Sequence, residues 1–212
     1  MAQPTIMQVQ LLSPDEVVDA CDEVARHILA SRFRPDVIVA VARGGFMPAR
    51  FLCDFLNLGT LCSIRVQHYA AGASQEKEAR VTIPLATDIR GARVLVVDDV
   101  NDSGDTLRAA RSYLEPLGPA ELRTAVLHEK LVTTCPADFS AGEVRKWRWI
   151  LYPWAMVEDI AQFIREMEPA PRNAEETFER LQACYGLYLT PAQLSRVVYF
   201  GGLPKALRPD AG

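Results

Sequence analysis

The sequence predicts an α/β fold with a central, mostly parallel sheet flanked by helices. Two short apolar runs rich in β-branched residues, Val37–Ala42 and Val94–Val97, have the composition of strands buried on both faces. Segments with helical periodicity alternate with such runs, which is typical of parallel sheets with right-handed crossovers. Because ligands of such sheets bind at the carboxyl ends of the strands, the residues after each run are the first candidates for a site.

The flanking elements follow from local signals. Ser13 can cap a helix that Pro14 begins, and Glu16 completes a capping box. Further helices are predicted over 48–56 and 103–114, and further strands over 122–127 and 147–152. Residues 68–82 combine small, turn-prone residues with a charged stretch, so we predict a loop that joins two strands and can close over a site.

The chain is predicted to divide into a main domain, residues 1–168, and a C-terminal helical extension, residues 169–212. In the extension, Asn173 can cap one helix, and Thr190 with Gln193 forms the capping box of a second. The extension carries too many apolar side chains to remain in water. We therefore expect it to pack on the core or on a partner subunit.

Composition narrows the class of protein. The 212 residues suffice for one substantial core, and the net charge of −4 argues against a nucleic-acid partner, which needs an excess of Lys and Arg. The five cysteines form no C-x-x-C pair, and their odd number fits reduced thiols. The N-terminus does not resemble a signal peptide, and no apolar segment approaches the roughly 20 residues that span a bilayer. We therefore expect a cytoplasmic protein without a membrane partner.

The stretch from Asp98 to Thr106 carries the clearest chemistry. Two adjacent carboxylates, Asp98 and Asp99, end a predicted strand, and a helix begins just after them. The amides of a helix N-terminus, with the hydroxyls of Ser103 and Thr106, suit a phosphate, and Gly104 lets the backbone approach it closely. The carboxylates suit sugar hydroxyls or a hydrated Mg²⁺ instead. A ligand with a phosphate, a diol and a metal-bound polyphosphate matches all these parts, whereas a P-loop is excluded because no Gly-Lys-Ser/Thr follows the strand.

This stretch closely resembles the binding motif for 5-phosphoribosyl pyrophosphate (PRPP) in type I phosphoribosyltransferases. Its surroundings, from about residue 35 to residue 154, are most similar to the xanthine–guanine and hypoxanthine–guanine enzymes. The resemblance implies the type I fold, with a small hood and a flexible loop. It also implies that Asp98 and Asp99 hold the ribose hydroxyls, partly through water on a bound Mg²⁺. The residues that would hold the 5-phosphate are Asp102, Ser103, Gly104, Asp105 and Thr106.

Other PRPP contacts are implied by weaker similarities. The turn Ala42–Gly45 resembles the family's pyrophosphate loop, in which a non-proline cis peptide presents backbone N–H groups, and Arg43 and Gly44 would contact the pyrophosphate. Tyr69 matches the second residue of a Ser-Tyr pair in the family's flexible loop. His68 replaces the serine, and we expect no chemical role for it. Asn101 also departs from the family, since many relatives carry an aliphatic residue there.

The base site is implied by two further matches. Lys130 aligns with the family lysine that contacts the 6-oxygen of a purine, and an ammonium, which only donates, rejects the 6-amino group of adenine. Trp149 would stack on the purine, and the backbone near Ile150 would bind its 2-position. Relatives commonly carry an acid where this chain has Ala155, so a second metal ligand stays open.

The resemblance therefore implies a Mg²⁺-dependent enzyme of purine salvage. It would convert PRPP and a 6-oxopurine, namely hypoxanthine, guanine or xanthine, to a nucleoside 5′-monophosphate and pyrophosphate, with Asp102 as the general base on the N7 proton. Two alternatives remain: a PRPP-binding regulator of the same fold that has lost catalysis, and a transferase for another acceptor such as uracil or an amine. A homo-oligomer is expected, with a dimer favoured.

Overall fold

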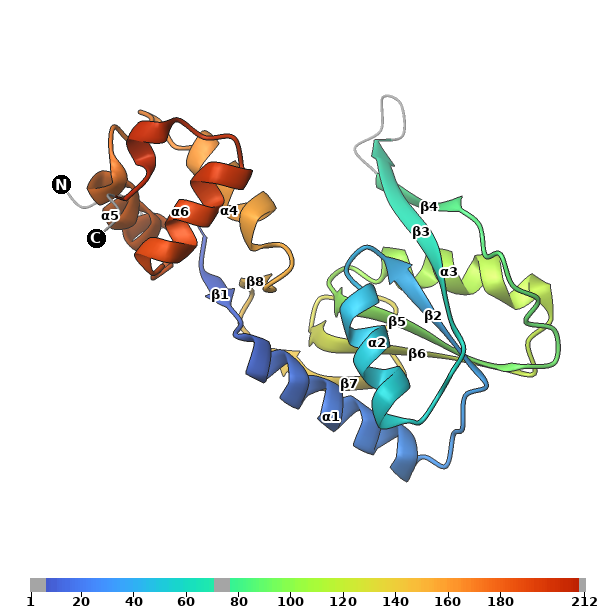
Figure 1. The fold of residues 1–212 in the computed structure, drawn as a ribbon. Coiled ribbons are helices and arrows are strands. Elements are labelled where there is room, and N and C mark those ends of the chain that lie inside the picture. Colours follow the sequence, from blue (N-terminus) through green and yellow to red (C-terminus); the bar gives the residue numbers. More distant parts are fainter. Residues whose placement is uncertain (1–6, 71–76, 210–212) are drawn as a thin grey trace. The chain divides into compact units, whose positions relative to one another are not determined.

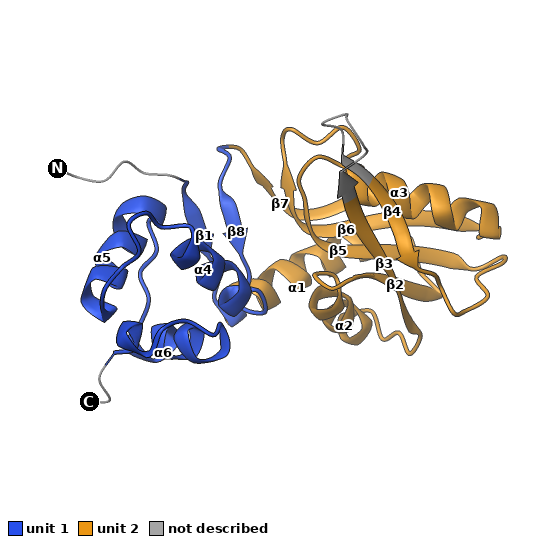
Figure 2. Cartoon of the chain, turned by 90° about the horizontal axis from the view of Figure 1, so that it is seen from above, with its two compact units in different colours: residues 1–14, 146–212 blue, residues 15–145 orange. Residues whose placement is uncertain are grey.

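The computed structural model describes residues 7–70 and 77–209, drawn in Figure 1. The chain forms two compact units, which are coloured separately in Figure 2 and are described here each by itself. We call residues 15–145 the sheet unit, and residues 1–14 with 146–212 the helical unit. The expected boundary at residue 168 therefore falls inside the helical unit. No helix in the described ranges is long and apolar enough to cross a membrane.

The sheet unit contains a six-stranded sheet in the order β4-β3-β2-β5-β6-β7. The strands are β2 (Val37–Ala42), β3 (Leu61–Ala70), β4 (Lys77–Ile83), β5 (Arg93–Asn101), β6 (Glu121–Lys130) and β7 (Phe139–Val144). Neighbouring strands are parallel except β3 and β4, which are antiparallel. This order confirms the predicted α/β fold with a mostly parallel sheet.

Helices cover both faces of this sheet. They are α1 (Pro14–Ala30), α2 (Phe46–Phe55) and α3 (Asp105–Leu114), followed by the short 3₁₀ helix η1 (Glu115–Leu117). Figure 2 shows α3 on one side of the sheet and α1 and α2 on the other. Alternate residues of β2 and β5, among them Val39 and Val96, pack with Ala110 and Leu114 of α3. Both central strands are therefore buried on two faces, as their unbroken apolar runs predict.

The prediction of a loop over residues 68–82 is wrong for residues 68–70 and 77–82. Most of this segment belongs to an antiparallel hairpin, in which His68 pairs with Ala79 and Gln67 pairs with Arg80. The hairpin contains β4, which is an edge strand of the sheet. Edge strands commonly carry charged side chains, so the polarity of this segment fits an edge strand as well as a loop. Residues 71–76 lie outside the described residues.

The helical unit combines the two ends of the chain. Its elements are β1 (Val9–Leu11), β8 (Trp149–Leu151), α4 (Met156–Arg165), α5 (Ala174–Tyr185), α6 (Pro191–Phe200) and the 3₁₀ helix η2 (Lys205–Leu207). The strand predicted over 147–152 exists, but it pairs in parallel with β1 in a separate two-stranded sheet. This strand therefore lies outside the central sheet. The two predicted caps are confirmed: Asn173 accepts a bond from the Glu176 amide, and Thr190 forms the capping box with Gln193.

The C-terminal helices complete a shared core in this unit. Residues of β8 and α4, such as Leu151 and Ile160, pack with Leu181 of α5 and Leu194 of α6. All four side chains are fully buried. The C-terminal segment thus packs against residues 149–167 and the strand β1 of its own chain.

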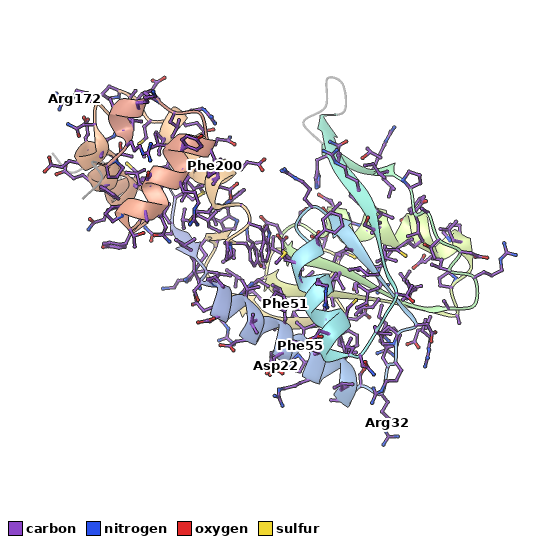
Figure 3. All side chains as sticks on the ribbon, viewed as in Figure 1. Asp22, Arg32, Phe51, Phe55, Arg172 and Phe200 are labelled. Carbon is purple, nitrogen blue, oxygen red and sulfur yellow. The ribbon has the colours of Figure 1, made fainter. Side chains whose placement is uncertain are left out.

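We expect Leu194→Ala to destabilise the helical unit by about 2–5 kcal/mol, because it leaves a cavity at a position with 0% exposure. Chemical denaturation followed by circular dichroism measures the change. Phe200→Ala on the same helix is the control: Phe200 is 71% exposed and labelled in Figure 3, and its truncation should change the free energy of unfolding by less than about 0.5 kcal/mol. Equal losses in the two variants would contradict this account of the core.

Candidate functional site

The turn after β2 lies directly against the acidic end of β5. The Ala42–Arg43 peptide bond is cis, as the similarity to the pyrophosphate loop implies. The turn is closed by the Gly45 amide, which donates to the Val41 carbonyl over 2.8 Å. A Cβ atom on Gly44 would lie 2.3 Å from Oδ2 of Asp99, so any other residue here would displace the Asp99 carboxylate. The structure therefore brings together two residues that the sequence places 55 positions apart.

The two carboxylates at the end of β5 are held by neighbouring amides. Oδ1 of Asp98 accepts a bond from the Asp99 amide over 2.9 Å, and Oδ1 of Asp99 accepts one from the Val100 amide over 2.8 Å. Burial, and next the negative charge of Asp99, raise the pKa of Asp98 well above its usual value. Two adjacent carboxylates with this mutual repulsion favour a site for a cation or for hydroxyl donors.

The carboxylates of Asp98 and Asp99 fit a magnesium ion that has few protein ligands. In the part of the chain that the structure describes, no group of three or more His, Cys, Asp or Glu side chains is placed to hold a metal. Mg²⁺ is usually bound by one or two carboxylates together with water and substrate phosphates, rather than by a full set of protein ligands. The paired carboxylates of Asp98 and Asp99 match that habit.

The predicted phosphate loop ends in a glycine with a constrained backbone. Gly104 has φ of 92° and directly precedes α3. A Cβ atom there would lie 2.6 Å from the Cys135 amide nitrogen, so both the backbone conformation and the space require glycine. Gly104 has no side chain to cap α3, and the Asp105 amide at the start of the helix donates to the Ser103 hydroxyl oxygen over 3.3 Å. The N-terminus of a helix suits an anion. Beside it, the Ser103 hydroxyl donates to Oδ2 of Asp105 over 2.7 Å.

The β3–β4 hairpin contacts the phosphate loop through His68. Its Nε2 lies 3.1 Å from the hydroxyl oxygen of Thr106. This contact was not expected, because no role was predicted for His68. The predicted PRPP contact Tyr69 belongs to β3, but its side chain lies outside the described residues.

Lys130 and Asp102 form an ion pair at the ends of adjacent strands. Nζ of Lys130 donates to Oδ2 of Asp102 over 2.6 Å. The lysine side chain is only 5% exposed, whereas that of the aspartate is 47% exposed. The pair thus presents a buried cationic donor beside a carboxylate acceptor that a ligand can reach. The residues predicted for base recognition and for proton transfer therefore lie together.

A second polar pair, Asn101 and Glu129, was missed in the sequence. Nδ2 of Asn101 donates to Oε1 of Glu129 over 2.8 Å, and both residues are buried. Burial raises the pKa of Glu129, and the bonds from Ala137 and Asn101 partly offset this. The available signal was a polar residue at an inward position of each of two neighbouring strands.

Trp149 and Ile150, predicted to bind the base, belong to the helical unit. Nε1 of Trp149 donates to Oδ2 of Asp159 over 2.7 Å, and its ring meets that of Phe163 edge-on at 6.5 Å. The side chain of Ile150 is buried. The participation of Trp149 and Ile150 in a base site stays a prediction.

Asp159 makes the stability of the helical unit depend on pH. Burial is the main cause that raises its pKa above 3.8, so the folded unit binds this proton more tightly than the unfolded chain. The contribution of Asp159 to the unfolding free energy is therefore complete below about pH 4, and it is lost as the pH rises through the raised pKa of the folded state. We expect Asp159→Asn to flatten the fall in unfolding free energy above pH 4, measured by denaturation at a series of pH values. An unchanged pH dependence would show that Asp159 does not titrate in this way.

Comparison with known proteins agrees with this geometry. The family model described as "Phosphoribosyl transferase domain" matches residues 7–159. The xanthine-guanine phosphoribosyltransferase of Ruegeria sp. (strain TM1040) is 35% identical over 124 residues, which cover 56% of this chain and 68% of the relative. The hypoxanthine-guanine phosphoribosyltransferase of Saccharomyces cerevisiae is 32% identical over 195 residues, covering 71% and 87%. The crystal structure of the purine phosphoribosyltransferase from Pyrococcus horikoshii Ot3 is 32% identical, with a TM-score of 0.61 over 70% of this chain and 94% of that one. The chain therefore belongs to the phosphoribosyltransferase family and has its type I fold.

Proposed function

We propose that the protein transfers the phosphoribosyl group of PRPP to a 6-oxopurine, which is hypoxanthine, guanine or xanthine. The products are a nucleoside 5′-monophosphate and pyrophosphate. The observation that carries this proposal is the pair of Lys130 and Asp102, a donor and an acceptor whose charged atoms lie 2.6 Å apart. One edge of a 6-oxopurine presents the matching groups: a 6-oxygen that accepts and an N7–H that donates. The 6-amino group of adenine cannot accept a bond from an ammonium.

PRPP would occupy the edge of the sheet where β2 and β5 end. The amides of Asp102–Thr106 and the N-terminus of α3 suit its 5-phosphate. The carboxylates of Asp98 and Asp99 suit the ribose hydroxyls. The backbone of Arg43 and Gly44, which lies against Asp99, would then face the pyrophosphate.

Asp98 and Asp99 would also hold Mg²⁺ through its water and the oxygens of PRPP. When bound, the ion neutralises charge that develops on the leaving pyrophosphate. The chain itself contributes the orientation of the carboxylates by the Asp99 and Val100 amides.

In the transfer, N9 of the purine attacks C1′ of the ribose and the bond from C1′ to the pyrophosphate oxygen breaks. The N7 proton passes to the carboxylate of Asp102, while Lys130 donates to the 6-oxygen. Such proton transfer contributes typically 10²–10⁴-fold to a rate. The β3–β4 hairpin contacts Thr106 through His68, and it would limit the access of water to the reacting carbon.

Trp149 would stack on the purine, which is worth roughly 1–3 kcal/mol per base. Its bond to Asp159 fixes the plane of the indole ring. In β8 the Trp149 amide donates to the carbonyl of Gln8, and the carbonyl of Leu151 accepts a bond from the Leu12 amide. The backbone N–H and C=O groups of successive residues point to opposite sides of a strand. Those groups of Ile150 therefore point away from β1 and can bind the 2-position of the base.

The test is pyrophosphate release from PRPP and Mg²⁺ with guanine, xanthine, hypoxanthine, adenine and uracil in parallel. Turnover of one or more 6-oxopurines, without adenine or uracil, is the expected result. PRPP binding without turnover of any base would point to a regulator, and turnover of uracil would point to another acceptor class. Either of these outcomes overturns the proposal.

Lys130→Met supplies a sharper version of this test. The variant keeps the apolar stem but loses the donor, so kcat/KM for the 6-oxopurines should fall roughly 10- to 100-fold, as expected for a hydrogen bond from a charged group. The Kd for PRPP, measured by calorimetry, should stay within about threefold because Lys130 lies on the base side of the site. A loss in PRPP affinity equal to the loss in kcat/KM would contradict the assigned role.

A further inference from the structure

The buried pair of Asn101 and Glu129 stands at a point of the sheet where apolar side chains are the norm. The two residues lie opposite each other on the parallel strands β5 and β6. Asn101 is 3% exposed and Glu129 is 8% exposed. Carboxylates are almost never buried to this degree without a partner. The pair therefore needs an explanation beyond packing.

Both members of the pair bind the segment that follows Lys130, residues 131–137. Nδ2 of Asn101 donates to the carbonyl of Cys135 over 2.8 Å, in addition to its bond with Glu129. The carboxylate of Glu129 accepts a bond from the Ala137 amide over 3.1 Å. Hydrogen bonds thus join residues 131–137 to the buried pair in the sheet.

The same segment lies directly on the phosphate loop. The Thr134 amide donates to the carbonyl of Ser103 over 3.0 Å, and the Thr134 hydroxyl donates to the same oxygen. The backbone of Cys135 lies against Gly104, because a Cβ atom on Gly104 would lie 2.6 Å from the Cys135 amide nitrogen. Arg108 of α3 also donates to the Thr134 hydroxyl. The place of residues 133–135 therefore fixes the backbone of Ser103 and Gly104.

We propose that Asn101 and Glu129 are positioning residues for the PRPP site: they hold residues 131–137 as a brace against the 5-phosphate loop. The kinetic part of this inference rests on the proposed function. A pair that served stability alone would be replaceable, since an apolar pair of similar size is often as stable as a buried polar one. The contacts to Cys135 and Ala137, which an apolar pair cannot make, are what ties it to the loop.

A single and a double variant together separate a role in stability from a role in positioning the loop. Asn101→Leu alone leaves the Glu129 carboxylate buried without its side-chain donor, and it should destabilise the protein. The variant Asn101→Leu/Glu129→Met replaces the pair by apolar side chains of similar size, and its denaturation midpoint should return close to that of the wild type. In this stable double variant we expect KM for PRPP to rise about tenfold, the size of effect that loss of a few ordinary hydrogen bonds gives, with kcat within about threefold. A wild-type KM in a stably folded double variant would overturn the proposal.

Glu129→Gln is a partial variant: its one oxygen can keep the bond from Asn101, but its NH2 group takes the place of Oε2, which accepts from the Ala137 amide. Its KM for PRPP should therefore lie between those of the wild type and the double variant. A KM as high as that of the double variant would count against the brace.

Two readouts do not need turnover. Amide hydrogen exchange in residues 131–137 should be faster in the double variant than in the wild type, and the affinity for ribose 5-phosphate should fall by about the same factor as KM for PRPP rises. If no base is turned over, the proposed transferase function fails while these two measurements still test the brace. Unchanged exchange together with unchanged ribose 5-phosphate affinity would overturn the brace alone.

Discussion

Gly44→Ala is expected to weaken PRPP binding by about 100-fold or more while the sheet unit stays folded. The new Cβ would lie 2.3 Å from Oδ2 and 2.6 Å from Oδ1 of Asp99. These atoms are the end of a side chain that can rotate away, so the protein can relieve the clash without unfolding. Asp99 would then leave the position where ribose and metal are expected, and displacement of about 1 Å at a site can cost 100-fold. Calorimetry with PRPP and Mg²⁺ measures the loss, and thermal unfolding monitors the fold.

Two other glycines provide matched controls for this variant. At Gly45 the added Cβ would lie 2.2 Å from the carbonyl oxygen of Val97, which belongs to the backbone of β5 and cannot rotate away. Gly45→Ala should therefore destabilise the protein itself. A Cβ on Gly142 would meet nothing within 4 Å, so Gly142→Ala should preserve both binding and fold. Normal PRPP affinity in Gly44→Ala would show that Asp99 does not need its present position.

Asp102→Asn is expected to lower kcat by about 100- to 10,000-fold with little change in the Kd for PRPP. The amide has the size of the carboxylate and still offers an oxygen to Nζ of Lys130, which now bonds to Oδ2 over 2.6 Å. It cannot take a proton from the purine, so the loss should fall on kcat. Pyrophosphate release gives kcat, and calorimetry gives the Kd.

The exposed residue Asp19 on α1 gives a control for Asp102→Asn, because Asp19→Asn changes the same charge at a place remote in sequence from the motif. Its kcat should equal that of the wild type. A wild-type kcat in Asp102→Asn would assign the proton acceptor to another group.

The sequence was informative where a contact is made within one short stretch. Asp98–Thr106 combines a strand end, a glycine and a helix start in order, and each part has the predicted form. The cis peptide before Arg43 and the pairing of Lys130 with Asp102 could be anticipated only through resemblance to a family. Nothing in the local pattern around either residue states which distant group it meets.

Features that depend on distant partners were missed for the same reason. The strand of Trp149 is predicted as a strand, but its partner is Val9 at the other end of the chain, which its local sequence does not indicate. Asn101 is separated from Glu129 by 28 positions, and neither residue alone indicates a buried pair. Polarity was misleading in the hairpin, because an edge strand and a loop tolerate the same side chains.

The pairing of β1 with β8 also sets an order for assembly of the chain. Residues 15–145 of the sheet unit are contiguous, whereas the helical unit draws on both ends. Translation proceeds at about 5–20 residues per second, so the first strand waits on the order of ten seconds before its partner is made. The sheet unit can therefore form before β1 has its partner. The β1–β8 pair is then the last strand pairing that the nascent chain completes, and it depends on an N-terminal segment that was synthesised first.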